Sequence, residues 1–185
     1  IDLLEYSLIK ETQNNTEILF KLRDSIYHNH RDYWFKTRAY THAFACNKIY
    51  KREIFKDLRY PKGKKFEDVW LLPNIIQQCQ TIATTACGYY HYYYNPHGIT
   101  ATADGMALQD LLNAHLKAFE QYQNADYYLS ILNVQIDVYN RLKSPILLPY
   151  KRYWTSFKLV LVSCLGIKTT CKIMNLLYKW RQKNR

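Results

Sequence analysis

The chain of 185 residues is long enough for one sizeable hydrophobic core with an appendage. Its five cysteines form no Cys-x-x-Cys pair, which argues against a zinc site or a dense disulfide framework and favours free thiols. The net charge of +11 arises entirely after Asp137, where the chain has eleven Lys and Arg residues and no acid. This segment predicts an anionic partner, either a membrane surface or nucleic acid.

The first part of the chain predicts short strands separated by loops. Residues 1–10 have the β-compatible composition of a strand, and residues 17–22 predict a second strand after a polar turn. Residues 28–38 lack a clean periodicity, which leaves a loop or a short helix open. The alternation in residues 39–50 predicts a half-buried strand that enters a short helix, and residues 58–66 then form a loop.

The middle of the chain predicts a helix followed by a strand. Residues 67–80 favour a helix, because an adjacent pair of acids stands in its first turn, where the helix dipole favours negative charge. Pro73 would fall inside this helix, so we expect the helix proper to start only around residues 69–72. Residues 81–94 are β-branched and aromatic, which predicts a strand or a hairpin that ends in a loop.

From Gly105 onward the pattern becomes helical. Leucine and aromatic residues recur at helical spacing up to residue 122, and Asp126 predicts the cap of a second helix that reaches about residue 142. Pro145 and Pro149 break the chain after it, and residues 153–185 then predict one or two basic amphipathic helices. Their longest apolar stretch, residues 159–167, is too short for a membrane-spanning helix.

Five pieces of the sequence stand in an order that is typical of a known enzyme family. They are NKIYKREIF at 47–55, Gly63, the acid pair Glu67 and Asp68, a tyrosine-rich strand at 89–94, and GIT at 98–100. Together they resemble the second half of a family 2 glycosyltransferase, over roughly residues 1–102. Each piece alone is weakly specific, and their common order and spacing carry the resemblance. It implies an α/β fold, with a partial GT-A-like mixed sheet and flanking helices, here followed by a C-terminal helical extension.

The resemblance also implies a reaction and its residues. The reaction is the transfer of a sugar from a nucleotide-sugar donor to an acceptor hydroxyl, with inversion at the anomeric carbon. Asp68 is the implied general base, because an attacking alcohol must lose its proton, and Glu67 would orient the acceptor or tune its neighbour. Lys48 and Trp70 would contact the acceptor, and His97 would contact the metal or the diphosphate of the donor.

Each of these residues also has a structural interpretation. The acid pair could simply begin a helix, Lys48 could form a structural ion pair, Trp70 could pack in the core, and His97 could be an exposed loop residue. The alternative for the whole chain is a non-catalytic membrane- or partner-binding module with a basic tail.

One large part of the family pattern is missing from the sequence. The donor-binding half of these enzymes carries an Asp-x-Asp motif that holds a divalent metal, Mg²⁺ or Mn²⁺, on the diphosphate, and this chain contains no Asp-x-Asp. The chain also begins at Ile1 rather than at Met. We therefore expect a fragment that lacks the donor-binding half, has no metal site of its own and is inactive alone.

The basic tail has three interpretations: a solvated helix, a nucleic-acid-binding patch or a membrane-surface anchor. We favour the membrane anchor, because aromatic and aliphatic residues alternate with Lys and Arg as in interfacial helices, and expect no nucleic acid partner, because no recognised binding motif accompanies the charge. Such an anchor suits an enzyme with a glycan or lipid-linked acceptor. The resemblance then implies a cytoplasmic protein, peripheral at the inner face of the membrane, that assembles a bacterial surface polysaccharide.

The domain organisation follows from these assignments. Residues 1–104 are predicted to form the acceptor-side half of a glycosyltransferase domain, residues 105–143 a helical hairpin, and residues 144–185 the basic membrane-associating tail.

Overall fold

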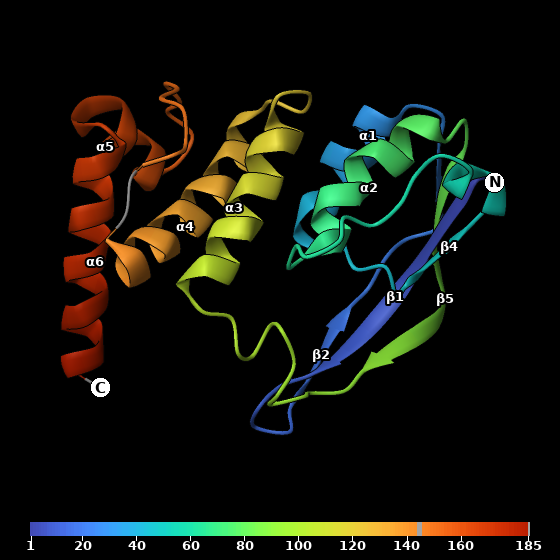
Figure 1. Ribbon diagram of the computed structural model, residues 1–185, viewed down its shortest axis with the longest axis horizontal. Helices are drawn as coiled ribbons and strands as arrows, with labels where there is room; N and C mark the ends of the chain where they lie inside the picture. The colour runs from blue at the N-terminus through green and yellow to red at the C-terminus, as the bar shows by residue number, and fades with distance from the viewer. Residues whose placement is uncertain (144–145, 185) are drawn as a thin grey trace. The chain divides into compact units, whose positions relative to one another are not determined.

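The computed structural model describes residues 1–143 and 146–184 and shows a mixed α/β protein (Figure 1). The chain divides into two compact units, Ile1–Thr102 and Ala103–Arg185, which we call unit 1 and unit 2. Unit 1 contains a sheet with helices, and unit 2 is helical. The mixed α/β class and the helical C-terminal part therefore agree with the sequence. The boundary predicted at residue 144 lies outside the described residues.

Unit 1 is built around a five-stranded mixed sheet whose central strand is β1 (Leu3–Glu11). On one side β1 pairs antiparallel with both β2 (Glu17–Phe20) and β4 (Lys48–Tyr50). On the other side it pairs parallel with β5 (Ile82–Tyr92). The two strands predicted at the start of the chain are confirmed, and the segment at 81–94 is a single strand rather than a hairpin.

A short strand that the sequence did not reveal completes the sheet. β3 (Ser25–Tyr27) pairs antiparallel with the first residues of β5. Three residues offer little periodicity, so this strand is set by its tertiary pairing. The prediction of a longer strand over residues 39–50 is wrong. Only β4 is extended there, because the preceding residues form the 3₁₀ helix η1 (Ala39–Thr41) and a loop.

Strand β5 is interrupted by a bulge. Tyr6 and Ser7 of β1 pair with Thr85 and Tyr89, so three residues of β5 between these partners are extra. Gly88 occupies the bulge with a φ of 77°, a conformation that favours glycine. A bulge of this kind increases the local twist, in keeping with the curled sheet. Beyond the bulge the residues of β5 are exposed.

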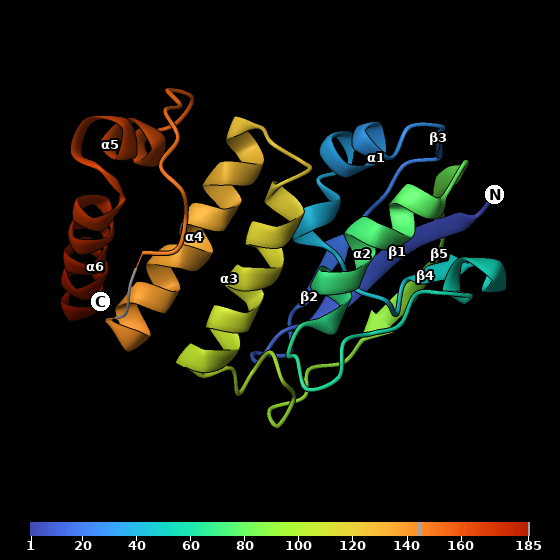
Figure 2. The same ribbon diagram turned by 45° about the horizontal axis from the view of Figure 1, so that its top comes forward.

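Two helices cover one face of this sheet (Figure 2). They are α1 (His30–Lys36) and α2 (Glu67–Gln78), and the short helix η2 (Arg52–Phe55) follows β4. Apolar side chains of both helices and of the sheet form the core, including Leu3, Tyr33, Leu72, Ile75, Ile76 and Ile82. The helix over 28–38 was one of the two possibilities that the sequence left open.

Helix α2 is continuous across Pro73, so the expected late start at residues 69–72 is wrong. The proline lacks the N–H that would bond to the carbonyl of Val69, a loss that typically costs about 3 kcal/mol. Burial of Val69, Leu72 and Ile76 on the same helix offsets this cost. The acids at 67 and 68 are therefore the true first turn of α2.

Unit 2 contains four helices in its described residues: α3 (Gly105–Phe119), α4 (Ala125–Leu142), α5 (Phe157–Leu165) and α6 (Ile167–Lys183). Asp126 was expected to cap α4, but Asn124 is the cap, and its side chain accepts a hydrogen bond of 2.7 Å from the amide of Tyr127. The basic tail forms two helices, which meet at Gly166.

Helices α3 and α4 approach closely where α3 begins. A Cβ atom on Gly105 would lie 2.3 Å from Cδ2 of Leu142, so glycine permits this contact. Among the described residues, no helix has both the length and the apolar content that crossing a bilayer requires.

Candidate functional site

The acid pair marks the junction between a lysine-rich loop and helix α2. Phe66 precedes the helix in a left-handed conformation, with a φ of 58°, and turns the chain into α2. Glu67 and Asp68 follow, both half-buried, and Asp68 Oδ1 accepts a hydrogen bond of 2.8 Å from the amide of Val69. This bond ties the Asp68 carboxylate to the start of the helix.

The surroundings of Asp68 favour its protonated form more than water does. Burial raises the pKa of the Asp68 carboxyl, and the charge of Glu67 acts in the same direction. The hydrogen bond from Val69 and the ammonium of Lys48 lower the pKa but do not cancel the effect of burial. A carboxylate whose pKa is raised in this way is a stronger base, which is the property that a proton-abstracting residue needs.

Aromatic side chains lie close to Asp68. Burial, and to a lesser degree the charge of Asp68, raises the pKa of both Tyr50 and Tyr60. The ring of Phe55 joins these two, with its centre 5.4 Å from that of Tyr50 and 6.2 Å from that of Tyr60. We call Tyr50, Phe55 and Tyr60 the aromatic row. Rings of this kind can pack against the apolar face of a sugar.

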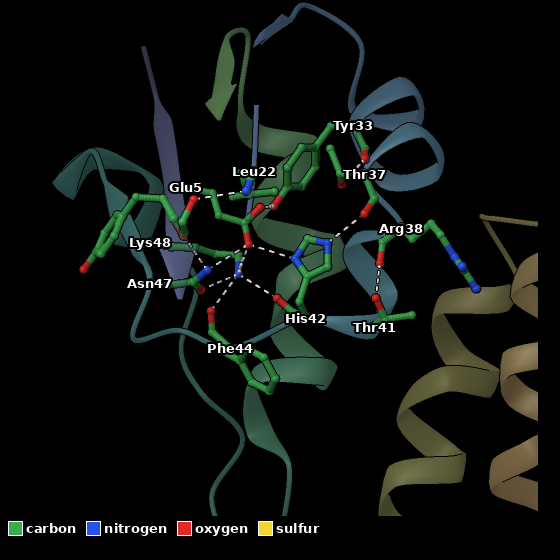
Figure 3. A network of polar contacts seen from close by, with 12 residues as sticks. Glu5, Leu22, Tyr33, Thr37, Arg38, Thr41, His42, Phe44, Asn47 and Lys48 are labelled. Atoms are coloured by element: carbon green, nitrogen blue, oxygen red, sulfur yellow. Dashed lines mark hydrogen bonds and ion pairs between the residues drawn. The ribbon is translucent and has the colours of Figure 1, made fainter. Parts of the chain in front are cut away.

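A network of buried polar and charged side chains surrounds Glu5 of β1 and includes Lys48 of the neighbouring strand β4 (Figure 3). Glu5 is its centre and is fully buried. Glu5 Oε1 lies 2.8 Å from both Nζ of Lys48 and Nδ1 of His42, and Oε2 accepts a 2.8 Å hydrogen bond from the hydroxyl of Tyr33. The amide of Asn47 also donates to Oε1, at 3.3 Å. We call these five residues the Glu5 network.

The partners in the Glu5 network determine its charge. Burial alone would raise the pKa of Glu5, but Lys48 and the hydrogen bond from His42 outweigh it and lower the pKa to about 2. The second ring nitrogen of His42 lies 2.8 Å from the carbonyl of Thr37. His42 therefore links the Glu5 carboxylate to the backbone at the end of α1.

Lys48 is committed to this interior network. Its ammonium donates to the carbonyls of His42 and Phe44, at 2.8 and 2.7 Å, and to Oδ1 of Asn47 at 3.1 Å. Its side chain is fully buried. This geometry favours the structural ion pair that the sequence left open, and the expected contact with an acceptor stays a prediction. Lys48 acts on the acid pair through its charge, which lowers the pKa of Asp68.

Trp70 and His97 have different surroundings. Trp70 is half-buried in α2, and the ammonium of Lys64 lies 5.6 Å from the centre of its ring. Its indole nitrogen is buried and has no hydrogen-bond partner among the described residues. His97 is exposed in the loop after β5, where its amide donates to Oδ1 of Asn95 at 2.9 Å. The roles expected for both residues stay predictions.

A cavity of about 660 Å³ opens on unit 1 beside η2 and the end of α2. Its charged lining residues are Asp2, Lys51, Glu53, Lys56 and Asp57, and Asp68 is not among its lining residues. Sequence reasoning singled out neither this cavity nor the aromatic row. The row had a visible signal in the sequence, since Tyr50 and Phe55 precede the basic loop at 58–66 and Tyr60 lies within it.

The described residues contain no group of three or more His, Cys, Asp or Glu side chains placed to hold a metal ion. The divalent metal that the resemblance implies was expected on the Asp-x-Asp motif of the donor-binding half, which this chain lacks, so it stays a prediction. A scan against protein-family models finds no match for this chain, and a search of curated proteins finds none either.

Proposed function

We propose that this chain is the acceptor-side half of an inverting glycosyltransferase with a GT-A fold. The proposal rests on one observation above all. Asp68, the acid that the family pattern assigns as base, is half-buried at the first turn of α2 with a raised pKa, and the charge of Asp68 acts on two tyrosines of the aromatic row. The mixed sheet with helices over one face is compatible with that fold.

In this proposal Asp68 carries the proton transfer. As the acceptor oxygen forms its bond to the anomeric carbon of the donor, the Asp68 carboxylate takes the hydroxyl proton and the nucleoside diphosphate leaves with the bonding electron pair. Glu67 keeps the pKa of Asp68 raised through its negative charge. Tyr60, which is 38% exposed, and Trp70 offer rings against which the acceptor sugar packs.

Helices α5 and α6 and the segment before them form the proposed membrane-associating part. Trp154, Phe157, Leu176 and Trp180 are each more than 60% exposed, and exposed Lys and Arg residues lie among them. Apolar side chains flanked by cations are what an interfacial helix needs at an anionic bilayer. We propose a peripheral position at the inner face of the cytoplasmic membrane, with a nucleotide-sugar donor, a glycan or lipid-linked acceptor, and a place in the assembly of a bacterial surface polysaccharide.

The second candidate is a non-catalytic module that binds a membrane or a partner through its basic tail. The observation that favours it is the burial of Lys48, because a residue expected to contact the acceptor serves the interior of unit 1 instead.

The substitution Asp68→Asn separates the two candidates. It is made in the protein that contains the donor-binding half as well as this chain. The amide keeps the shape of the carboxylate but cannot accept the proton, so we expect transfer to fall by roughly 10²- to 10⁴-fold while nucleotide-sugar binding persists. Transfer is measured as nucleoside diphosphate release from a panel of nucleotide sugars. Asp57→Asn, an exposed acid of the neighbouring loop, is the matched control and should leave transfer unchanged. Equal activity of Asp68→Asn and the control would favour the binding module.

A further inference from the structure

Unit 2 contains a cavity of its own that the proposed reaction does not use. Its volume is about 790 Å³, within the range of small-molecule binding sites. We call it the lysine pocket. It is lined by residues of α4, of the segment after α4 and of α6: Tyr139, Lys143, Ile146, Leu148, Tyr150, Ile167, Lys168 and Lys172.

The charge of the lysine pocket has one sign. Three of its eight lining residues are lysines, none is an acid, and the sequence has no acid after Asp137. Asp137 does not line the pocket, and burial raises its pKa although the charges of Lys158 and Arg141 act in the opposite direction. The pocket therefore attracts anions.

Two of the lysines stand close to each other at the cost of helix stability. Lys168 and Lys172 are four residues apart on α6, so they project from the same face, where like charges repel. Both are exposed. The third, Lys143, is held at the end of α4, where its ammonium donates to the carbonyl of Asn140 at 2.9 Å. An anion between these cations would relieve the repulsion.

The beginning of α6 adds to this positive field. The helix starts at Ile167 and Lys168, which both line the pocket, and no side chain caps it. The first amides of a helix carry a partial positive charge that favours an anion.

The interior of the pocket is apolar and held in place. Leu148 and Ile167 are buried, and Ile146 lies beside them. The segment that contains Leu148 is fixed to α4, because Gln135 Oε1 accepts hydrogen bonds of 2.8 and 3.0 Å from the amides of Leu147 and Leu148. Gln135 is fully buried, so the wall of the pocket is set by an interior contact.

A cationic rim above an apolar interior fits a ligand with two chemical parts. We propose that the lysine pocket binds a phosphate group attached to an apolar chain, as in the headgroup of an anionic lipid, with the phosphate between Lys168 and Lys172 and the start of the chain against Leu148 and Ile167. Free phosphate shares the first part of this chemistry but not the second. The inference rests on unit 2 alone, so its failure would leave the proposal for Asp68 untouched.

The test measures binding of two soluble probes to the whole chain by titration calorimetry. The probes are dihexanoyl phosphatidic acid, kept below its micelle concentration, and inorganic phosphate. We expect the lipid to bind more tightly than phosphate, because only the lipid reaches the apolar interior. Equal affinities would overturn the lipid part of the inference and identify free phosphate as the ligand.

A pair of matched variants locates the site. The double variant Lys168→Gln and Lys172→Gln should weaken binding of the lipid roughly thirty-fold, because each of the two lysines contributes a similar electrostatic attraction to the phosphate. Lys179→Gln with Lys183→Gln removes the same charge with the same spacing from the same helix, outside the pocket, and should keep the affinity of the unchanged chain. If both pairs weaken binding equally, or if neither probe binds the unchanged chain, the pocket is not a phosphate site.

Discussion

The two units bury their ionisable side chains in different ways. In unit 1 the carboxylate of Glu5 is buried together with the ammonium of Lys48, and its pKa is lowered to about 2 despite burial. In unit 2 the buried His115 packs against Tyr127, with its Nδ1 3.1 Å from the tyrosine hydroxyl, and burial lowers its pKa to about 4. The first group stays charged and the second stays neutral. The comparison shows that the partner, and not burial alone, decides the state of an interior group.

Removal of the cation from the Glu5 network should have the largest effect on stability. Lys48→Met leaves the carboxylate of Glu5 buried without its ammonium partner, and we expect a loss of about 3–5 kcal/mol in the free energy of unfolding. Urea unfolding, followed through backbone NMR signals of unit 1, measures the loss. The double variant with Glu5→Gln should recover part of it, because no unpaired charge then remains. A loss below about 1 kcal/mol would mean that the network is not desolvated as its geometry indicates.

Acid should separate the two units. Because the pKa of His115 is about 4 in the folded state against an ordinary 6.5, the unfolded state binds the additional proton between these values, and unit 2 loses stability as the pH falls from 6.5 to 4. The loss is on the order of 3 kcal/mol. Glu5 contributes stability that is fully present above pH 4.5 and is lost as the pH falls toward 2. We therefore expect the stability of unit 2 to fall at a higher pH than that of unit 1. Urea unfolding across this pH range, with each unit followed by its own NMR signals, measures the difference.

A variant isolates the histidine in this comparison. His115→Gln retains a side chain that can hydrogen-bond to Tyr127 but removes the titrating group. It should abolish the loss of stability of unit 2 between pH 6.5 and 4 while leaving the stability of unit 1 unchanged. An unaltered pH profile would assign the acid sensitivity to other groups.

The smallest effect is expected at the surface of unit 1. Lys51 and Asp2 form an ion pair of 2.6 Å in which the lysine side chain is 55% exposed. Lys51→Met should therefore cost less than about 1 kcal/mol, since water screens exposed pairs. The same unfolding experiment is done on Lys48→Met. The difference between the two losses in the free energy of unfolding measures how burial changes the cost of removing the lysine from a lysine–carboxylate pair. Equal losses for the two variants would contradict the comparison of buried and exposed charge.

Elements with a long or strongly periodic pattern could be predicted from the sequence. Strand β1, helix α3 and the end of α4 were found in this way, because a buried face repeats over many residues. Strand β3 could not be predicted, because a three-residue strand has no period. The start of α2 could not be predicted either, because the sequence alone does not show the burial that offsets the cost of Pro73. Of the candidate site, the sequence indicated the acid pair but not the aromatic row, which tertiary contacts assemble.

The sequence by itself determined the neutral N-terminal part, the basic tail, and the alternation of short strands and helices. These are local properties, set by composition and by neighbours along the chain. Only the tertiary structure decided which charges are buried. The sequence left open whether Lys48 contacts an acceptor or forms a structural ion pair, and Lys48 is an interior cation because β1 places Glu5 beside it on the neighbouring strand. The energy of a charge depends on the partners and the solvent around it, and folding brings those partners together from distant parts of the chain.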